Sequence, residues 1–147
     1  NQIAADLKAV GMPVTLRPLP LETLIQTLNG RKAALFYNAW FPDYFDAYGV
    51  LEPLLHSRHA GTGTNRTDYR NPQVDALIDR SVSVTDPAQH TQLLQQAEAL
   101  ALADAPYVPL TYALETRLVA PGVGGVTIDP VWPVVRFSEI WKSSSDK

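Results

Sequence analysis

The sequence has no cysteine, and it has few charged residues for its length. The absence of cysteine from 147 residues excludes a disulfide framework, thiol catalysis and cysteine ligation of zinc. Charged residues make up 18% of the chain, and its 12 lysines and arginines are scattered, so a nucleic-acid partner is not expected. No apolar run approaches the roughly 20 residues that a membrane span needs.

Hydrophobic residues make up 46% of the chain, which is enough for a buried core. Ile3, Leu7 and Val10 fall on one face of a helix over residues 2–10, and Gly11 supplies a left-handed stop. This helix has no capping residue before it. We therefore expect the chain to be a piece of a longer protein.

The next stretch has the pattern of a βαβ unit. Apolar and polar residues alternate over 14–17, an apolar stripe follows over 21–28, and an apolar run occupies 33–40. This order predicts strand, helix and strand, with the two strands as parallel neighbours. The fold class expected is α/β.

Three further helix starts are visible. Asp46 is placed to cap a helix through Leu55, and the pairs Asn71-Pro72 and Asp86-Pro87 each join a capping residue to a first-turn proline. The polar residues 57–70 predict an exposed loop. The pattern beyond 106 predicts strand-like structure over 107–120, a turn at Pro121-Gly122 and an extended stretch over 126–135.

The C-terminal residues are apolar without a polar face of their own. Such a segment needs a surface supplied by something else, and its members are Val134, Val135, Phe137, Ile140 and Trp141.

The strongest candidate site follows the apolar run 33–40. Ligands of open α/β sheets bind beyond the carboxyl ends of strands, where Asp43 is expected, with Trp40 and Tyr44 as aromatic walls. Asn38 precedes the strand end and is a further candidate. A carboxylate in that place suits a cationic group such as a peptide α-amino group. From the local sequence alone, a helix N-cap or an exposed loop carboxylate is equally open.

Two enzymatic interpretations have weaker support. Asp43 and Asp46 form a carboxylate pair of the kind glycoside hydrolysis uses, and His56 and His59 have a spacing that permits metal binding. Solvated histidines are the better interpretation. The sequence contains no triad order, phosphate loop or dinucleotide fingerprint, so we expect no enzyme and no cofactor.

Several short motifs, in order and at matching spacing, carry a family resemblance. The chain resembles the C-terminal part of the extracytoplasmic solute-binding proteins of oligopeptide and dipeptide ABC importers (bacterial extracellular solute-binding protein family 5). The motifs are Val10-Gly11, Val14-Thr15-Leu16-Arg17-Pro18-Leu19-Pro20, Trp40-Phe41-Pro42-Asp43-Tyr44, Tyr69-Arg70-Asn71-Pro72-Gln73-Val74-Asp75-Ala76-Leu77-Ile78, Ala105-Pro106-Tyr107-Val108-Pro109-Leu110 and Pro121-Gly122-Val123.

The resemblance implies a bilobal α/β fold that encloses ligand between two lobes. Residues 1–115 would form the later part of the second lobe, and residues 116–147 would return to the first. In the peptide binders the aspartate of the W-x-x-D-Y pattern pairs with the ligand's α-amino group, and this pattern places it at Asp43. The family often has proline shortly after the pattern, where this chain has Phe45-Asp46-Ala47.

The resemblance implies a periplasmic or cell-surface receptor that captures short peptides and delivers them to a membrane permease. Its other partner would be the missing N-terminal part of the same protein. The ligand class is open among a dipeptide, a longer peptide, glutathione, a nickel complex and a sugar. Two other hypotheses are a ligand-sensing domain of a regulator and a metal-dependent hydrolase using His56, His59 and an aspartate.

Overall fold

The computed structural model describes residues 2–61, 63–112, 114, 116–127 and 135–143. Its contacts divide the chain into two compact units, the first ending at Phe36 and the second beginning at Tyr37. Within the described part, no helix combines the length and the apolar character needed to cross a membrane.

The first unit contains two helices, both at predicted positions. Helix α1 (Gln2–Ala9) ends before Gly11, whose φ of +85° is the left-handed conformation that glycine adopts at little cost. Helix α2 (Leu21–Asn29) buries Leu28 and ends where the Gly30 N–H donates to the Gln26 carbonyl.

The strands predicted in this stretch are absent. None of the described residues over 14–17 and 33–40 is in a β-strand, and the side chains of Leu16 and Leu35 are exposed. The prediction of a βαβ unit is therefore wrong for this structure. A strand is held by hydrogen bonds to a neighbouring strand, and the described residues supply none for either segment.

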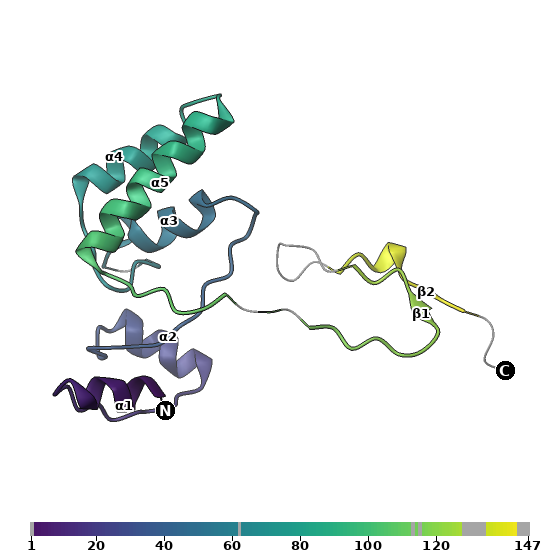
Figure 1. Ribbon diagram of the computed structural model, residues 1–147, viewed down its shortest axis with the longest axis horizontal. Helices are drawn as coiled ribbons and strands as arrows, with labels where there is room; N and C mark the ends of the chain where they lie inside the picture. The colour runs from purple at the N-terminus through teal and green to yellow at the C-terminus, as the bar shows by residue number, and fades with distance from the viewer. Residues whose placement is uncertain (1, 62, 113, 115, 128–134, 144–147) are drawn as a thin grey trace. The chain divides into compact units, whose positions relative to one another are not determined.

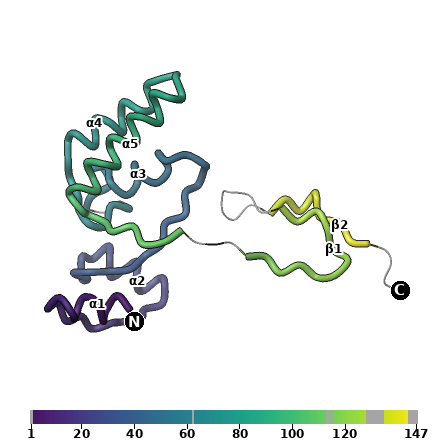
Figure 2. Tube along the Cα trace, in the orientation of Figure 1, coloured from purple at the N-terminus to yellow at the C-terminus, as the bar shows by residue number. Residues whose placement is uncertain are grey.

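The second unit is built on three helices that the capping residues predicted. These are α3 (Tyr48–Leu55), α4 (Pro72–Ser81) and α5 (Pro87–Asp104), with a short 3₁₀ helix η1 (Ser57–His59) after α3. Helices α4 and α5 lie side by side as an antiparallel pair (Figure 1), and the chain turns back between them through a short connection (Figure 2).

Capping fixes where α4 and α5 begin. The Asn71 side-chain oxygen accepts hydrogen bonds from the Gln73 and Val74 N–H groups, at 2.9 and 3.4 Å. The Asp86 carboxylate accepts from the Ala88 N–H at 3.1 Å. Each satisfies backbone donors that a helix start leaves without partners.

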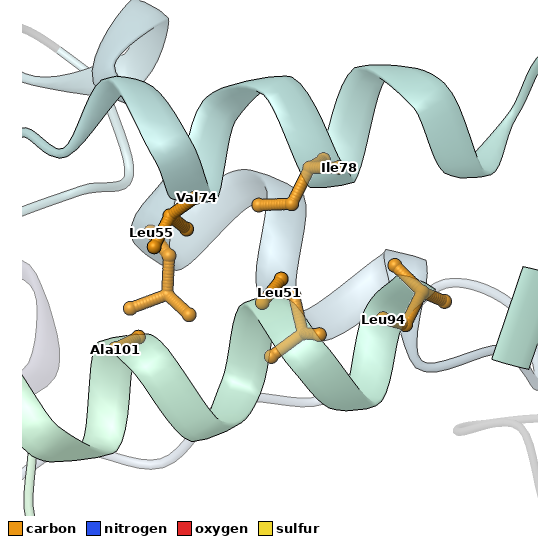
Figure 3. Packing of buried hydrophobic residues seen from close by; sticks show 7 residues of the cluster. Leu51, Leu55, Val74, Ile78, Leu94 and Ala101 are labelled. Carbon is orange, nitrogen blue, oxygen red and sulfur yellow. The ribbon is translucent and has the colours of Figure 1, made fainter. Parts of the chain in front are cut away.

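The hydrophobic core lies where α3 meets the α4–α5 pair. Figure 3 shows side chains of α4 and α5 pointing toward one another, with side chains of α3 beside them. Burying each large aliphatic side chain contributes roughly 1.5–3 kcal/mol, so this cluster dominates the stability of the unit. The buried residues are Leu51, Leu55, Val74, Ile78, Leu94, Ala97 and Ala101.

A polar cluster joins the end of α5 to the start of α4. The Asp104 carboxylate accepts hydrogen bonds from the Tyr69 hydroxyl at 2.7 Å and the Asn71 side-chain amide at 2.8 Å. Burial, together with the bond to Asp104, raises the pKa of Tyr69 to about 12, and the two hydrogen bonds lower the pKa of Asp104. Ala105 follows with φ of +52°, in the left-handed conformation, at the C-cap of α5.

The segment 57–70 is more ordered than the exposed loop predicted. The side chain of Asn65 is fully buried, and its amide donates to the His56 carbonyl at 3.3 Å and the Tyr69 carbonyl at 2.8 Å. Its oxygen accepts from the Thr67 hydroxyl and the Tyr69 N–H, each at 3.2 Å. The segment is polar, as predicted, but the buried side chain of Asn65 holds it in an ordered conformation through these hydrogen bonds.

The described C-terminal part contains a small antiparallel ladder and little other regular structure. Strand β1 (Val123–Gly124) pairs with β2 (Trp141–Lys142), and a 3₁₀ helix, η2 (Phe137–Glu139), precedes β2. The predicted turn at Pro121-Gly122 is confirmed by a Gly122 φ of +78°.

Other predictions for this part have mixed outcomes. None of the described residues within 107–120 is in a strand, so that prediction is wrong here. Phe137 and Trp141 are exposed, as expected of a segment that lacks a covering surface. Val134 and most of the predicted extended stretch 126–135 lie outside the described residues.

Candidate functional site

The candidate site is the segment from Trp40 to Ala47, which we call the aspartate loop and which leads directly into α3. Its first residue is anchored to that helix, because the Trp40 indole N–H donates to the Gly49 carbonyl at 2.9 Å. The indole ring is half-buried. Trp40 therefore fixes the entry of the loop instead of standing free in solvent.

Tyr44 and Pro42 pack against the start of α3 at Gly49. A Cβ atom added to Gly49 would lie 3.3 Å from two atoms of the Tyr44 ring and 3.4 Å from the Pro42 Cβ. Burial raises the pKa of Tyr44, with smaller contributions from the neighbouring acidic groups. The Tyr44 ring thus packs directly over Gly49, which has no side chain.

Asp43 lies between these anchored residues and is exposed. Among the described residues it has no hydrogen-bond or ion-pair partner. Asp46 was predicted to cap this helix, but the N-cap position of α3 is Ala47, which makes no side-chain cap hydrogen bond. Asp46 lies one residue earlier, where its carboxylate accepts from the Tyr48 N–H at 2.7 Å and its own N–H donates to the Tyr44 carbonyl at 2.9 Å.

Asn38 is the least defined of the four predicted site residues. It is exposed and makes no hydrogen bond with any other residue in the described part of the chain. The structure brings Trp40 and Tyr44 together at Gly49, with Asp43 between them in sequence. It gives Asn38 no comparable anchor.

The two histidines of the metal hypothesis are not the solvated residues expected. His56 is buried, and its Nδ1 accepts from the Arg58 N–H at 3.1 Å. His59 is half-buried, with its Nε2 2.6 Å from a Glu52 carboxylate oxygen. The Arg58 guanidinium lies 2.9 Å from His56 Nε2 and also pairs with Asp79. Among the described residues, no group of three or more His, Cys, Asp or Glu side chains is arranged to hold a metal ion.

One further residue at the loop, His90 on α5, is not predictable from the sequence pattern. Its Nε2 lies 3.1 and 3.2 Å from the two Asp46 carboxylate oxygens, and its Nδ1 lies 2.8 Å from the Ser81 carbonyl. The bond to Ser81 and the Asp46 carboxylate raise the pKa of His90 against the opposing effect of burial. The partners are 44 residues apart, and no local spacing rule reports such a contact.

Comparison with solved structures shows the fold: the chain matches part of a bilobal α/β structure. The chain superposes on "Clavulanic acid biosynthesis oligopeptide binding protein 2" with a TM-score of 0.84 and 24% identity, over 96% of this chain and 27% of that one.

Sequence comparison with curated proteins also finds binding proteins. The chain is 30% identical over 91% of its length to the "Probable deoxycholate-binding periplasmic protein YgiS" of Escherichia coli, covering 24% of that protein. It is 28% identical over 89% of its length to "Di/tripeptide-binding protein 4" of Pseudomonas aeruginosa, covering 25%. The E. coli "Periplasmic oligopeptide-binding protein OppA" is 30% identical over 82% of this chain, covering 21% of that protein.

These matches confirm the predicted resemblance: the chain is homologous to a partial region of the periplasmic oligopeptide- and dipeptide-binding proteins. It spans about a quarter of the length of the curated relatives it matches. The relatives are named as binding proteins and not as enzymes. No protein-family model matches the sequence.

Proposed function

We propose that the chain is part of a solute-binding receptor of an ABC importer, which captures short peptides and delivers them to a membrane permease. The observation that carries this proposal is the aspartate loop: an exposed carboxylate, free of described partners, between two aromatics anchored on Gly49. The relatives named for di-, tri- and oligopeptides supply the ligand class.

The charge of Asp43 supports one ligand class over the others. The relatives' names span peptides, deoxycholate and heme. Deoxycholate is an anion, and placing it beside an unpaired carboxylate would add repulsion. A peptide α-amino group is a cation near neutral pH, and a hydrogen bond to a charged group contributes roughly 1.5–3 kcal/mol. Asp43 therefore favours a ligand with a free amine.

The division of the chain between two lobes is part of the proposal. Residues 1–115 would belong to the second lobe and residues 116–147 to the first, with the remainder of the receptor supplied by sequence outside this chain. The exposed Phe137 and Trp141 support this division, because they lack a cover among the described residues. The periplasmic relatives support an extracytoplasmic location as part of this proposal.

The mechanism is capture and not catalysis. A ligand that bridges two lobes binds their closed arrangement better than the open one, and it shifts the population toward closure by its difference in affinity. Asp43 would hold the amine, while Trp40 and Tyr44 would cover the neighbouring backbone without demanding a particular side chain. Asn38 is placed at the edge of this contact.

The test is peptide binding by the complete protein, measured calorimetrically with a matched ligand pair. A tripeptide with a free α-amino group is compared with its N-acetylated form. We expect Asp43→Asn to weaken binding of the free peptide by about tenfold or more, on the energy scale of a charged hydrogen bond. Binding of the acetylated peptide, already weak, should change little.

Glu98→Gln is the matched control, since it removes one exposed carboxylate on α5 far along the sequence from the loop. It should leave both affinities unchanged. Equal binding of the free peptide by wild type and Asp43→Asn would remove Asp43 from the site. Tight binding of deoxycholate with no peptide binding would overturn the ligand class.

A further inference from the structure

The aspartate loop is tied to the α4–α5 pair by one histidine. His90 Nδ1 faces the Ser81 carbonyl at 2.8 Å, and a carbonyl oxygen can only accept, so this ring nitrogen carries a proton. His90 Nε2 faces both oxygens of the Asp46 carboxylate, at 3.1 and 3.2 Å. A neutral ring would then set a lone pair against a carboxylate. The geometry favours the doubly protonated imidazolium, in agreement with the raised pKa of His90.

Asp46 passes this contact on to the loop and to α3. One of its oxygens accepts from the Tyr48 N–H at 2.7 Å, at the start of the helix. Its N–H donates to the Tyr44 carbonyl at 2.9 Å, and its carbonyl accepts from the Gly49 N–H at 3.1 Å. Asp43 directly precedes Tyr44, the first residue that these bonds hold in place.

The charges around His90 are few. Asp46 faces it from the loop, and α4 presents the uncharged Ser81 carbonyl. On α5 itself, Asp86 lies one turn earlier, where its carboxylate caps the Ala88 N–H and its carbonyl accepts from the His90 N–H at 2.9 Å. Among the described residues, Asp46 is the charged group that acts on the titration of His90.

We propose that His90 is a positioning residue for the peptide site, and that its protonated ring holds the Asp46 turn so that Asp43 is set for the ligand amine. This inference rests on the proposed function. It makes peptide capture depend on pH through a residue that touches no ligand. The ligand class it serves is the cationic amine of a short peptide.

The direction of the pH dependence follows from the raised pKa of His90. The contact is fully formed below the ordinary histidine value of about 6.5 and is lost as pH rises through the higher value in the folded protein. Loop order and peptide affinity should therefore fall as pH rises through that range.

The first experiment measures the peptide dissociation constant of the complete protein by calorimetry from pH 5.5 to 8.5. The variants are His90→Gln and Asp46→Asn, and each keeps a hydrogen-bonding group while removing one charge. Both should bind about threefold or more weakly than wild type at pH 5.5 and should approach it at pH 8.5. The ligand's own titration cancels in these comparisons.

His59→Gln is the matched control, because it removes a histidine paired with Glu52 outside the loop. It should keep the wild-type pH profile. Wild-type and His90→Gln profiles that run parallel across the whole range would overturn the positioning role.

A second measurement needs no ligand and separates this inference from the proposed function. Hydrogen–deuterium exchange of the complete protein reports the amides of residues 44–50. We expect faster exchange there in His90→Gln and Asp46→Asn at pH 5.5, with α4 and α5 unchanged. Unchanged exchange across 44–50 would overturn the inference. If the loop responds but no peptide binds to wild type, the proposed function fails and the coupling stands.

Discussion

Two regions of the second unit differ in the solvent exposure of their apolar side chains. One is the group of three helices α3, α4 and α5, and the other is the segment after Ala105. The helices bury the apolar side chains that face one another: Val74 and Ile78 have no solvent exposure. The following segment exposes most of its apolar side chains, and those of Tyr112 and Leu118 are fully exposed. Composition alone does not separate the two regions, since both are rich in large aliphatic and aromatic residues.

The difference lies in where each region finds its hydrogen bonds. A helix satisfies its backbone internally and needs only another helix to cover its apolar stripe. An extended segment needs a neighbouring strand for its backbone as well as a cover for its side chains. The α4–α5 pair therefore covers its facing apolar side chains within the described residues, whereas the described residues of 107–119 pair with no neighbouring strand there.

The largest effect should come from the core of the helical region. Ile78→Ala leaves a cavity between α4 and α5 and should lower the free energy of unfolding of the complete protein by about 2–5 kcal/mol. Urea denaturation measures this change. Leu102→Ala removes a half-exposed leucine from α5 and is the control, with an expected change within about 0.5 kcal/mol. Equal effects of the two substitutions would contradict the assignment of the core.

The second prediction tests whether the segment after Ala105 is also exposed in the complete protein. Leu118→Ala should cost the complete protein about 2 kcal/mol, the scale of burying a leucine, because the proposed first lobe covers it. Denaturation under the same conditions gives the answer. A change within about 0.5 kcal/mol would show that nothing covers Leu118 and would remove support for the two-lobe division.

A smaller effect is expected at the buried polar side chain of the segment between α3 and α4. Asn65→Ala removes the amide that donates to the Tyr69 carbonyl and one of the two donors to the His56 carbonyl, and it should cost about 1–3 kcal/mol. Thr67→Val is the milder comparison, since it removes a single hydrogen bond to Asn65. The idea fails if Asn65→Ala unfolds at the same urea concentration as wild type.

The helices were predictable because their signals are local. Asn71 and Asp86 each bring a capping oxygen to a backbone donor two residues away, and the apolar stripes of α3, α4 and α5 repeat at the helical period. The strands were not predictable in the same way, because strand pairing depends on residues that are distant in the sequence. The burial of Asn65 was not predicted, because asparagine is a residue type typical of exposed loops. Its side chain is buried here because it hydrogen-bonds to His56, Thr67 and Tyr69.

The site was predictable in part. The W-x-x-D-Y pattern drew attention to Trp40, Asp43 and Tyr44, and their assignment to ligand binding stays a prediction. The contact of His90 with Asp46 spans 44 residues and becomes visible only when α5 packs beside the loop. The burial of His56 was equally invisible, because an isolated histidine gives no sign of the carboxylates and arginine that the fold gathers around it.

The aspartate loop packs so closely on Gly49 that a small side chain at this position would disturb it. A Cβ atom added to Gly49 would lie 3.3 Å from two ring atoms of Tyr44 and 3.4 Å from the Pro42 Cβ. An alanine there would make the tyrosine ring shift by a few tenths of an ångström. Gly49→Ala would thus reshape the aspartate loop while Trp40, Asp43 and Tyr44 were all preserved.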